Sequence, residues 1–316
     1  MPAAAVYSIL IKKENAHDDP IYCCAWGNAN AAGDSKASKT DYIVTGGLDG
    51  LIKVWKLENS KLESVHTLQE HTMAVVSVAI SPDGHTLAST SLDCTLIIWD
   101  LPSGRKVHEV SAGPTDVWKV AFSPDGVQVV SGSHTGKLIV YGIEKGTTDR
   151  VLDTRGKFAL SVAWSPDHSF IASGSVDGAV SIFDVHQGKL LHTIEAHTKP
   201  VRGITFTPNS KFIVTASNDG NVNVYDVESG SLQNRFDHKC WALTACVSAD
   251  GTRVATGAAD GSVNVLLAVG LKLHHAFKEH SDTVWGVQFN AEGNKLLSVS
   301  KDKSIIIYEC PLLPKK

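Results

Sequence analysis

Residues 81–100 read SPDGHTLASTSLDCTLIIWD, and this stretch decides the fold. It contains a Ser-Pro-Asp-Gly turn sequence, a short segment of small and β-branched residues, a second turn at Asp93, and an apolar segment that ends in Trp99-Asp100. Turn residues on both sides of short β-type segments predict strands that are joined by tight turns. The same arrangement of turns and short segments recurs along the chain.

The turn at Asp93 recurs with an almost constant spacing. Its equivalents are Asp49, Asp93, Thr135, Asp177, Asp219, Asp260 and Asp302, separated by 44, 42, 42, 42, 41 and 42 residues. Six residues after each of them comes a bulky apolar residue: Trp55, Trp99, Tyr141, Phe183, Tyr225, Leu266 and Tyr308. The Ser-Pro-Asp-Gly turn recurs in the same register, from Ser81 to Asn290. Two series of turns in one register predict an internal repeat of about 42 residues.

The segments between the turns are short and rich in Val, Ile and Ala, and no long segment has a helical period, so we expect an all-β protein. The units resemble the WD-repeat family, whose units each form one four-stranded blade of a β-propeller. Trp99-Asp100 is the only intact Trp-Asp pair. The resemblance implies a single seven-bladed propeller over residues 1–316, with units at about 14–57, 68–101, 110–143, 152–185, 194–227, 235–268 and 277–310.

The two ends of the repeat region predict how the ring closes. The seventh unit stops at Cys310-Pro311 and lacks its outermost strand, whereas an extra strand-like segment at about residues 6–11 precedes the first unit. We expect that N-terminal strand to pair in the last blade, which leaves only short exposed edges.

The first unit is ten residues longer than the others before its turn. The excess lies in residues 27–41, which are small and polar, and it predicts a flexible insertion within the first blade. The alternative is that this insertion contacts a partner and is not merely a tolerated loop.

Composition limits the possible functions. The chain has 316 residues, of which 43% are hydrophobic and 20% charged, and its formal net charge is −4. Only six of the 29 positive residues are arginines, so we expect no direct contact with nucleic acid. No apolar window of 18 residues exists and the first residues do not resemble a signal peptide, so we expect no membrane segment.

No motif indicates a cofactor, a metal ion or a catalytic centre. The six cysteines form no Cys-x-x-Cys pair, and the phosphate-binding loop, the zinc-binding His-Glu-x-x-His and the Gly-x-Ser-x-Gly nucleophile motif are absent from the sequence. The pair His274-His275 stands alone and is more consistent with a solvent-side pair than with a metal site.

Histidine, hydroxyl and carboxylate residues recur in the units as they do in hydrolytic triads. Unit two contains His71, Ser89 and Asp93, followed by Trp99. The other histidines and aspartates of the series are His17, Asp49, Asp177, His197, Asp219, His238, Asp260, His280 and Asp302. A catalytic site occurs once, whereas a structural network occurs once per blade. We therefore interpret the series as the hydrogen-bonded network that the resemblance implies, in which each carboxylate finds its donors.

A β-bulge is predicted in the strand that follows each histidine position. Apolar residues lie four, seven and nine positions after it, as in Val75, Val78 and Ile80, and regular alternation cannot bury both of the first two. A bulge near the fifth position resolves this and turns that side chain toward one end of the central channel. The residues at the fifth position are Tyr22, Val76, Trp118, Leu160, Arg202, Leu243 and Trp285, and Phe158 and Trp241 lie two positions earlier in their units.

These side chains predict a mostly apolar, aromatic rim that binds proteins, because Trp, Tyr and Arg are enriched in binding hot spots. His134, Asn218 and Lys301, just before the turn aspartates, would form its polar edge. The alternative is that some of the rings only pack between blades.

Several local sequences narrow the resemblance. They are Glu14 to Asp19, Ala112 to Trp118, Leu152 to Phe158, Gly188 to Thr193 and Asp282 to Val287. Together they closely resemble the WD-repeat subunits shared by the superkiller complex and the RNA polymerase II-associated factor complex. The resemblance implies a non-catalytic scaffold, a monomer by itself, in the nucleus and the cytoplasm. Its implied partners are a tetratricopeptide-repeat scaffold and an RNA helicase in exosome-mediated mRNA decay, and subunits that act in transcription elongation and histone modification.

Other functions remain as alternatives. A substrate receptor of a ubiquitin ligase, or another WD-repeat adaptor, would use the same rim. An RNA-binding protein would need a basic face, and an enzyme would need a unique polar constellation in the channel. Neither feature is present in the sequence.

Overall fold

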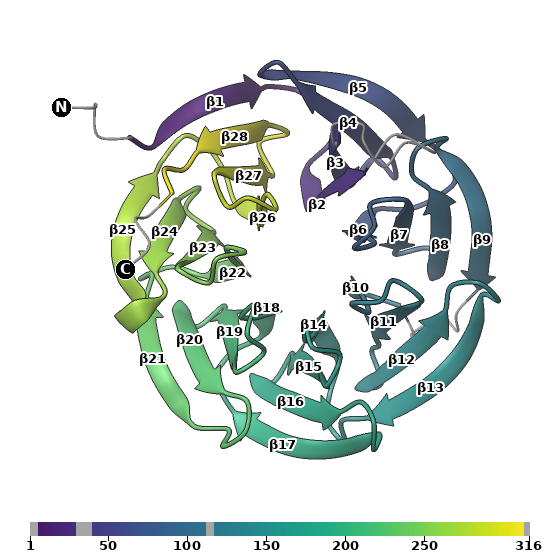
Figure 1. The fold of residues 1–316 in the computed structure, drawn as a ribbon, viewed down its shortest axis with the longest axis vertical. Helices are drawn as coiled ribbons and strands as arrows, with labels where there is room; N and C mark the ends of the chain where they lie inside the picture. The colour runs from purple at the N-terminus through teal and green to yellow at the C-terminus, as the bar shows by residue number, and fades with distance from the viewer. Residues whose placement is uncertain (1–5, 30–39, 112–116, 313–316) are drawn as a thin grey trace.

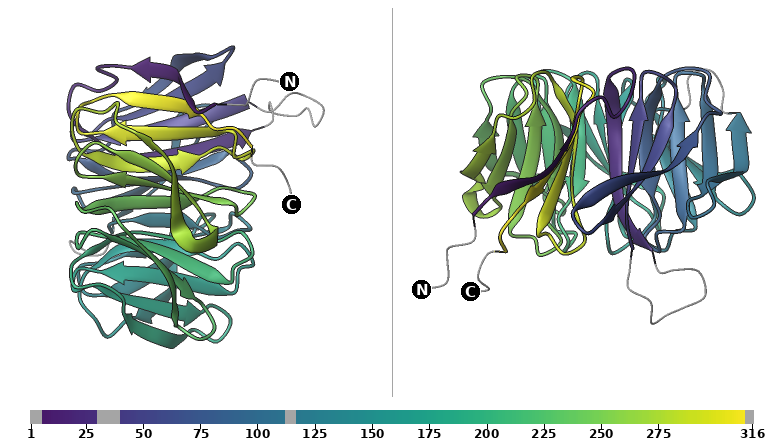
Figure 2. Two further views of the ribbon diagram at one scale, coloured as in Figure 1. Left: turned by 90° about the vertical axis from the view of Figure 1, so that its left-hand side faces the viewer. Right: turned by 90° about the horizontal axis from the view of Figure 1, so that it is seen from above.

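The computed structural model describes residues 6–29, 40–111 and 117–312. Within these residues the chain forms seven four-stranded antiparallel sheets arranged as blades around a central axis (Figure 1). The inner strands run roughly along that axis, as the right-hand view of Figure 2 shows, whereas the outermost strands follow the perimeter in Figure 1, and the molecule is a short cylinder. The predicted all-β, seven-bladed propeller is therefore confirmed.

The first four blades follow one another along the chain. Blade one contains β2 (Ile21–Ala29), β3 (Thr40–Gly47), β4 (Ile52–Glu58) and β5 (Lys61–Leu68). Blade two contains β6 (Val75–Ile80), β7 (Thr86–Ser91), β8 (Thr95–Asp100) and β9 (Arg105–Ser111). Blade three contains β10 (Val120–Phe122), β11 (Gln128–Gly132), β12 (Lys137–Gly142) and β13 (Thr147–Asp153). Blade four contains β14 (Ala159–Trp164), β15 (Phe170–Ser175), β16 (Ala179–Asp184) and β17 (Lys189–Glu195).

The remaining blades continue the series until the ring closes. Blade five contains β18 (Val201–Phe206), β19 (Phe212–Ser217), β20 (Asn221–Asp226) and β21 (Leu232–Asp237). Blade six contains β22 (Ala242–Val247), β23 (Arg253–Ala258), β24 (Val263–Leu267) and β25 (Lys272–Phe277), with a 3₁₀ turn, η1 (Val269–Leu271), before β25. Blade seven contains β26 (Val284–Phe289), β27 (Lys295–Ser300), β28 (Ile305–Glu309) and β1 (Ser8–Lys13).

The N-terminal strand completes the last blade, as the sequence predicts. β1 pairs antiparallel with β28, from Ser8 opposite Glu309 to Lys13 opposite Ile305, and Figure 1 shows it as the outermost strand of that blade. The strand begins two residues later than expected and extends two residues further, because pairing continues beyond an irregularity between Ile9 and Ile11. The ring is thus closed by hydrogen bonds between segments about 300 residues apart.

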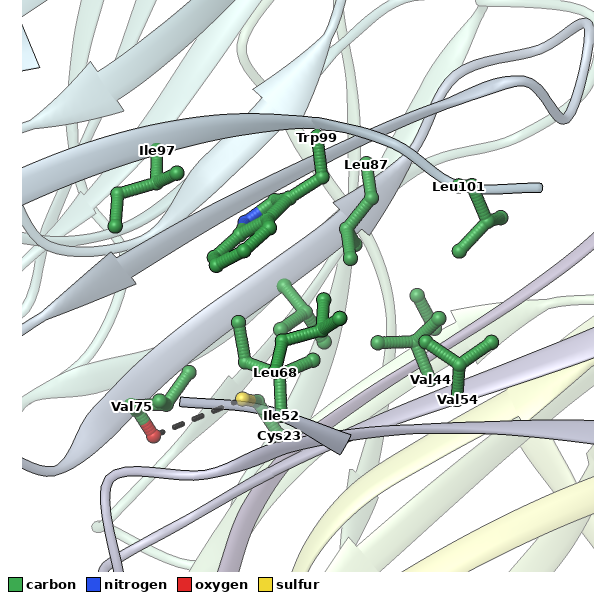
Figure 3. Packing of buried hydrophobic residues seen from close by; sticks show 12 residues of the cluster. Cys23, Val44, Ile52, Val54, Leu68, Val75, Leu87, Ile97, Trp99 and Leu101 are labelled. Carbon is green, nitrogen blue, oxygen red and sulfur yellow. Dashed lines mark hydrogen bonds between the residues drawn. The ribbon is translucent and has the colours of Figure 1, made fainter. Parts of the chain in front are cut away.

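The hydrophobic core lies between the blades. In the described part of the chain, buried apolar side chains form seven clusters, and each cluster joins two neighbouring blades. Figure 3 shows the cluster between blades one and two, where Ile52 and Leu68 face Trp99. The Cys23 thiol in this cluster donates to the carbonyl oxygen of Val75 at 3.8 Å. Since no blade buries both of its faces alone, the stability of each blade depends on its neighbours.

The predicted insertion in blade one is partly strand. β2 and β3 pair as far as Ala29 opposite Thr40, so residues 27–29 and 40–41 belong to the sheet. The expected boundaries 27–41 were too wide, because small and polar residues can still pair through their backbones. Residues 30–39, where the rest of the insertion was predicted, lie outside the described residues.

Candidate functional site

Bulges place one side chain from each of six innermost strands at one end of the central channel. In six blades of the described structure, the pairing of the innermost strand skips one residue, and that residue is Tyr22, Val76, Leu160, Arg202, Leu243 or Trp285. These are the fifth-position residues, so the predicted bulge is confirmed in those blades. In blade three β10 begins at Val120, after Trp118, and residues 112–116 lie outside the described residues.

The fifth-position residues of all seven blades line one cavity of about 810 Å³ along the central channel. Val76 lies at the start of β6 and Ile80 at its end, and both line the cavity, which therefore follows the innermost strands from end to end. Figure 1 shows this axis unobstructed by strands. The rim is the end of the channel where the fifth-position side chains meet.

Aromatic side chains of neighbouring blades pair at the rim. Trp118 meets Phe158 edge to face, with ring centroids 5.0 Å apart, and His134 stacks on Phe158 at 3.7 Å. Across the junction of blades seven and one, Trp285 meets Tyr22 edge to face at 5.5 Å. Each such pair contributes about 0.5–1.5 kcal/mol beyond its buried area. Tyr22, Trp118, Phe158 and Trp285 are only partly buried, so the rings pack between blades and also remain accessible from the rim.

The other predicted rim residues fall into different environments. Leu160 and Leu243 line the cavity but are only 5% and 4% exposed, so they form its wall and not an open patch. Trp241 is 51% exposed and does not line the cavity. Asn218 is buried, and its Oδ1 atom has no hydrogen-bond partner among the described residues. Lys301 is exposed and forms an ion pair with Asp282 at 3.2 Å.

Leu48, Leu92 and Lys119 are among the cavity residues that were not predicted from the sequence. Leu48 and Leu92 line the cavity and are 43% and 41% exposed. Both stand directly before a turn aspartate, in the register from which His134, Asn218 and Lys301 were predicted to form the polar edge, so this register was the signal that could have identified them. Lys119 also lines the cavity, directly after Trp118.

The recurring histidine, hydroxyl and carboxylate residues form buried networks in four blades. In blade two, His71 contacts Asp93 through Nδ1 at 3.1 Å and Ser89 through Nε2 at 2.8 Å, and Trp99 Nε1 donates to Ser89 Oγ at 2.8 Å. The equivalent His–Asp contacts are His17–Asp49, His197–Asp219 and His280–Asp302, at 2.9–3.0 Å. Each network connects the loop before a blade to the turn between its second and third strands.

Protonation states in blade two follow from burial and hydrogen bonding. Burial lowers the pKa of His71, although Asp93 opposes this, so the imidazole is neutral near pH 7. Burial alone would raise the pKa of Asp93, but hydrogen bonds from Thr95 and from the Thr72 N–H, together with His71, lower it. A neutral ring that donates to an ionised carboxylate holds the turn in place.

Three blades depart from this network, and in blade three Thr135 stands in the position of the turn aspartate. In blade six, His238 contacts Thr256 through Nε2 at 2.7 Å, and its Nδ1 lies 3.1 Å from the amide nitrogen of Asn264 and not against Asp260. His238 and Asp260 thus lack the direct contact of the other four blades, because Asn264 occupies the histidine's other side. Asp260 instead accepts from Ser262 at 2.6 Å. In blade four, Asp177 accepts a long bond, 3.4 Å, from the Ala179 N–H, and Arg155 stands in the histidine position.

The triad-like geometry does not form an accessible site. The side chain of Ser89 is completely buried, as is that of Thr45 in blade one, so neither hydroxyl can reach a substrate. The same arrangement also recurs around the ring. Within the described residues, no three His, Cys, Asp or Glu side chains are grouped to hold a metal ion, and no helix could cross a membrane.

Comparison with known proteins agrees with this geometry. A family model described as the IFT122 first beta-propeller matches residues 36–309, and a model described as WD domain, G-beta repeat, matches residues 8–56. The chain belongs to the WD-repeat β-propeller family. This WD-repeat propeller keeps the spacing of its turns although Trp99-Asp100 is its only intact Trp-Asp pair.

Relatives that are similar over part of the chain come from different organisms. The WD repeat-containing protein SL1-17 of Schistosoma mansoni is 34% identical over 113 residues, which is 36% of each chain. The WD repeat-containing protein VIP3 of Arabidopsis thaliana is 32% identical over 105 residues, 33% of this chain and 30% of the relative. The small ribosomal subunit protein RACK1y of Oryza sativa subsp. japonica is 42% identical over 71 residues, 22% of this chain and 20% of the relative. The chain thus spans about a third or less of the length of the curated relatives it matches.

Proposed function

We propose that this WD-repeat propeller is a non-catalytic scaffold that binds segments of partner proteins at the rim. The observation that carries the proposal is the set of bulges, which turn one side chain in each of six blades toward a single cavity. Aromatic rings of neighbouring blades pair at the same rim. Rigid, partly buried aromatic residues bind partner side chains at a low cost in conformational entropy. Exposed Leu48 and Leu92 extend the apolar surface beside blades one and two.

We further propose that the protein is the WD-repeat subunit shared by the superkiller complex and the RNA polymerase II-associated factor complex. The support is the resemblance of its local sequences, which include Asp282 to Val287 around the rim residue Trp285. In this role it would act in the cytoplasm, with a tetratricopeptide-repeat scaffold and an RNA helicase in mRNA decay. In the nucleus it would act in transcription elongation and histone modification.

Affinity purification of the tagged protein with mass spectrometry tests both proposals. The wild type is compared with a Trp118→Ala, Trp285→Ala double variant and with a matched Val107→Ala, Leu191→Ala control. The control removes exposed apolar side chains from the outer strands β9 and β17. Thermal melting of all three proteins separates lost binding from lost folding.

Loss of superkiller and polymerase-associated subunits from the rim variant alone is the expected result, while this variant, which lacks the two aromatic pairs, still unfolds in one transition well above the temperature of the purification. Retention of these subunits by the rim variant would contradict binding at the rim. Recovery of other partners by the wild type, such as ubiquitin-ligase subunits, would contradict the assignment to the two complexes and leave the scaffold role intact.

A further inference from the structure

The central cavity carries a positive charge that the cavity itself does not balance. Its lining includes Lys119 and Arg202, and none of the described lining residues is an aspartate or a glutamate. The chain as a whole has a formal net charge of −4, so the cavity is opposite in sign to the rest of the molecule. A concave, partly apolar wall strengthens such a field because it keeps water away from the charges.

Arg202 has no partner for its guanidinium within the described structure. Its Nε atom is buried and makes no hydrogen bond, and no ion pair involves Arg202 among the described residues. Burial lowers its pKa, and no described carboxylate opposes the effect. An unpaired buried donor costs free energy that the folded protein alone does not recover. A group that enters the cavity and accepts a hydrogen bond from the Arg202 guanidinium would offset this free-energy cost.

The side chains on both sides of Arg202 are apolar, so a group that binds its guanidinium is surrounded by apolar walls. Arg202 lies between Leu160 of blade four and Leu243 of blade six in the ring of fifth-position residues, and both leucines are almost fully buried. An acceptor bound to the guanidinium would therefore meet apolar walls on both sides. In such surroundings a charge-assisted hydrogen bond is stronger than at an open surface.

Lys119 provides a second cation inside the cavity. Burial raises the pKa of the Cys23 thiol to about 12, and the charge of Lys119 acts against this rise. The same charge acts on Cys24, which lines the cavity. The ammonium group therefore influences the wall formed by blade one, although Lys119 itself belongs to blade three.

We propose that the rim binds an acidic segment of a partner protein, in which an Asp or Glu side chain pairs with Arg202 and apolar side chains contact Trp118 and Trp285. The inference rests on the proposed function, because it specifies the chemistry of the segment bound at the same rim. Two cations in a cavity of about 810 Å³ suit one or two carboxylates. A nucleic acid would be held by a longer series of basic residues along its backbone.

Selection from a random peptide display library tests the proposal. The immobilised proteins are the wild type, Arg202→Gln, Arg202→Glu and a matched Arg105→Gln control, in which an exposed arginine of β9 is replaced. Peptides that combine Asp or Glu with apolar residues are expected to be enriched on the wild type and on the control. Arg202→Gln should lose the acidic enrichment, and Arg202→Glu should select Lys or Arg instead.

Affinity measurements make the test quantitative. Fluorescence anisotropy compares the best selected peptide with a copy in which its acidic residue is replaced by the corresponding amide. We expect the wild type to bind the amide copy about 10- to 100-fold more weakly, and Arg202→Gln to bind both peptides equally. Because Arg202 has no internal partner, Arg202→Met should melt at or above the wild-type temperature. A lower melting temperature would overturn the inference by showing a structural role for Arg202.

Other outcomes overturn the inference in distinguishable ways. Selected peptides that lack acidic residues, but whose binding is lost in Trp118→Ala, would refute the acidic segment and leave rim binding intact. Peptide binding that is indifferent to Trp118, Trp285 and Arg202 would refute both. A fluorescein-labelled oligouridine bound more tightly than any selected peptide, in an Arg202-dependent way, would replace the acidic peptide by a nucleic acid.

Discussion

Arg253 of β23 donates a hydrogen bond from Nη1 to the carbonyl oxygen of Pro311, 58 residues further along the chain, at 2.9 Å. Its Nη2 atom donates to the carbonyl oxygen of Gly293 at 2.8 Å, and the side chain is completely buried. The nearest carboxylate oxygen, from Asp250, is 3.9 Å away, so backbone carbonyls provide most of the compensation for the buried charge. One side chain of blade six thus holds the first turn of blade seven and the segment that follows β28.

Arg253→Lys is expected to destabilise the protein although it keeps the charge. A single ammonium group cannot reach both carbonyl oxygens with the geometry of a guanidinium, so one charge-assisted bond is lost, at a cost of about 1.5–3 kcal/mol. Urea denaturation of the variant and of an exposed control, Arg105→Lys, measures the effect. Equal stability of Arg253→Lys and wild type would show that the two bonds contribute nothing to folding.

Disruption of β1 should destabilise the whole ring and not only its last blade. Ile11 pairs with Ile307 and packs against the cluster between blades seven and one. Ile11→Pro removes a backbone donor and disturbs the pairing, so we expect the melting temperature to fall by on the order of 10 °C in one cooperative transition. Val6→Pro, before the strand, is the control. A two-step unfolding curve for Ile11→Pro would show instead that the blades unfold separately.

The blades and their bulges can be predicted from the sequence because the repeat aligns equivalent positions of all seven units. Once Asp93 and its equivalents are aligned, the pattern of apolar residues around Val75 and Val78 requires a bulge at Val76, and the structure has one. The same register predicts that the last blade lacks a strand, which β1 supplies. These features are local or periodic, so a single sequence is sufficient to predict them.

Removal of the Ser89 hydroxyl should destabilise blade two through two groups that lose their partner. Trp99 Nε1 and His71 Nε2 both contact Ser89 Oγ, at 2.8 Å, in a fully buried site. Ser89→Ala leaves both without this partner and should lower the free energy of unfolding by about 1–3 kcal/mol per unsatisfied group. Ser64→Ala, at an exposed serine of β5, is the matched control. An unchanged free energy in Ser89→Ala, measured by urea denaturation, would mean that water or a shifted ring satisfies the two nitrogens.

Contacts that break the periodicity could not be predicted from the sequence. The pairing of Arg253 with Pro311 links an isolated arginine to a backbone carbonyl, and neither belongs to a recurring position. His238 contacts Asn264 although Asp260 is present at the turn position of the same unit. Which of the two side chains lies against the imidazole depends on three-dimensional packing, which the repeat pattern does not specify. The same limit applies at the rim. Trp241 and Trp118 are the same kind of residue near the start of an innermost strand, yet Trp241 lies outside the cavity and Trp118 lines it.

The free energy of unfolding should fall as the pH is lowered from about 6.5 to about 4, largely because of His238. Burial lowers its pKa from the ordinary value of 6.5 to about 4, and burial also lowers the pKa of His71 and of His197. Between pH 6.5 and 4 the unfolded chain therefore binds protons that the folded protein does not. The free energy of unfolding consequently rises with pH in this window and falls as the solution is acidified, by up to about 3 kcal/mol for His238 alone.

His238→Gln isolates this contribution, because an amide does not titrate. We expect the variant to be less stable than wild type at pH 7, since the contact with Thr256 changes, but to lose less stability between pH 7 and pH 5. Urea denaturation at pH 7, 6 and 5 measures the slope, with His186→Gln, at an exposed histidine, as the control. The carboxylates of the network do not obscure the result, because the lowered pKa values of Asp93 and Asp219 place their contribution below pH 4. A wild-type slope in His238→Gln would mean that His238 is already accessible to protons in the folded blade.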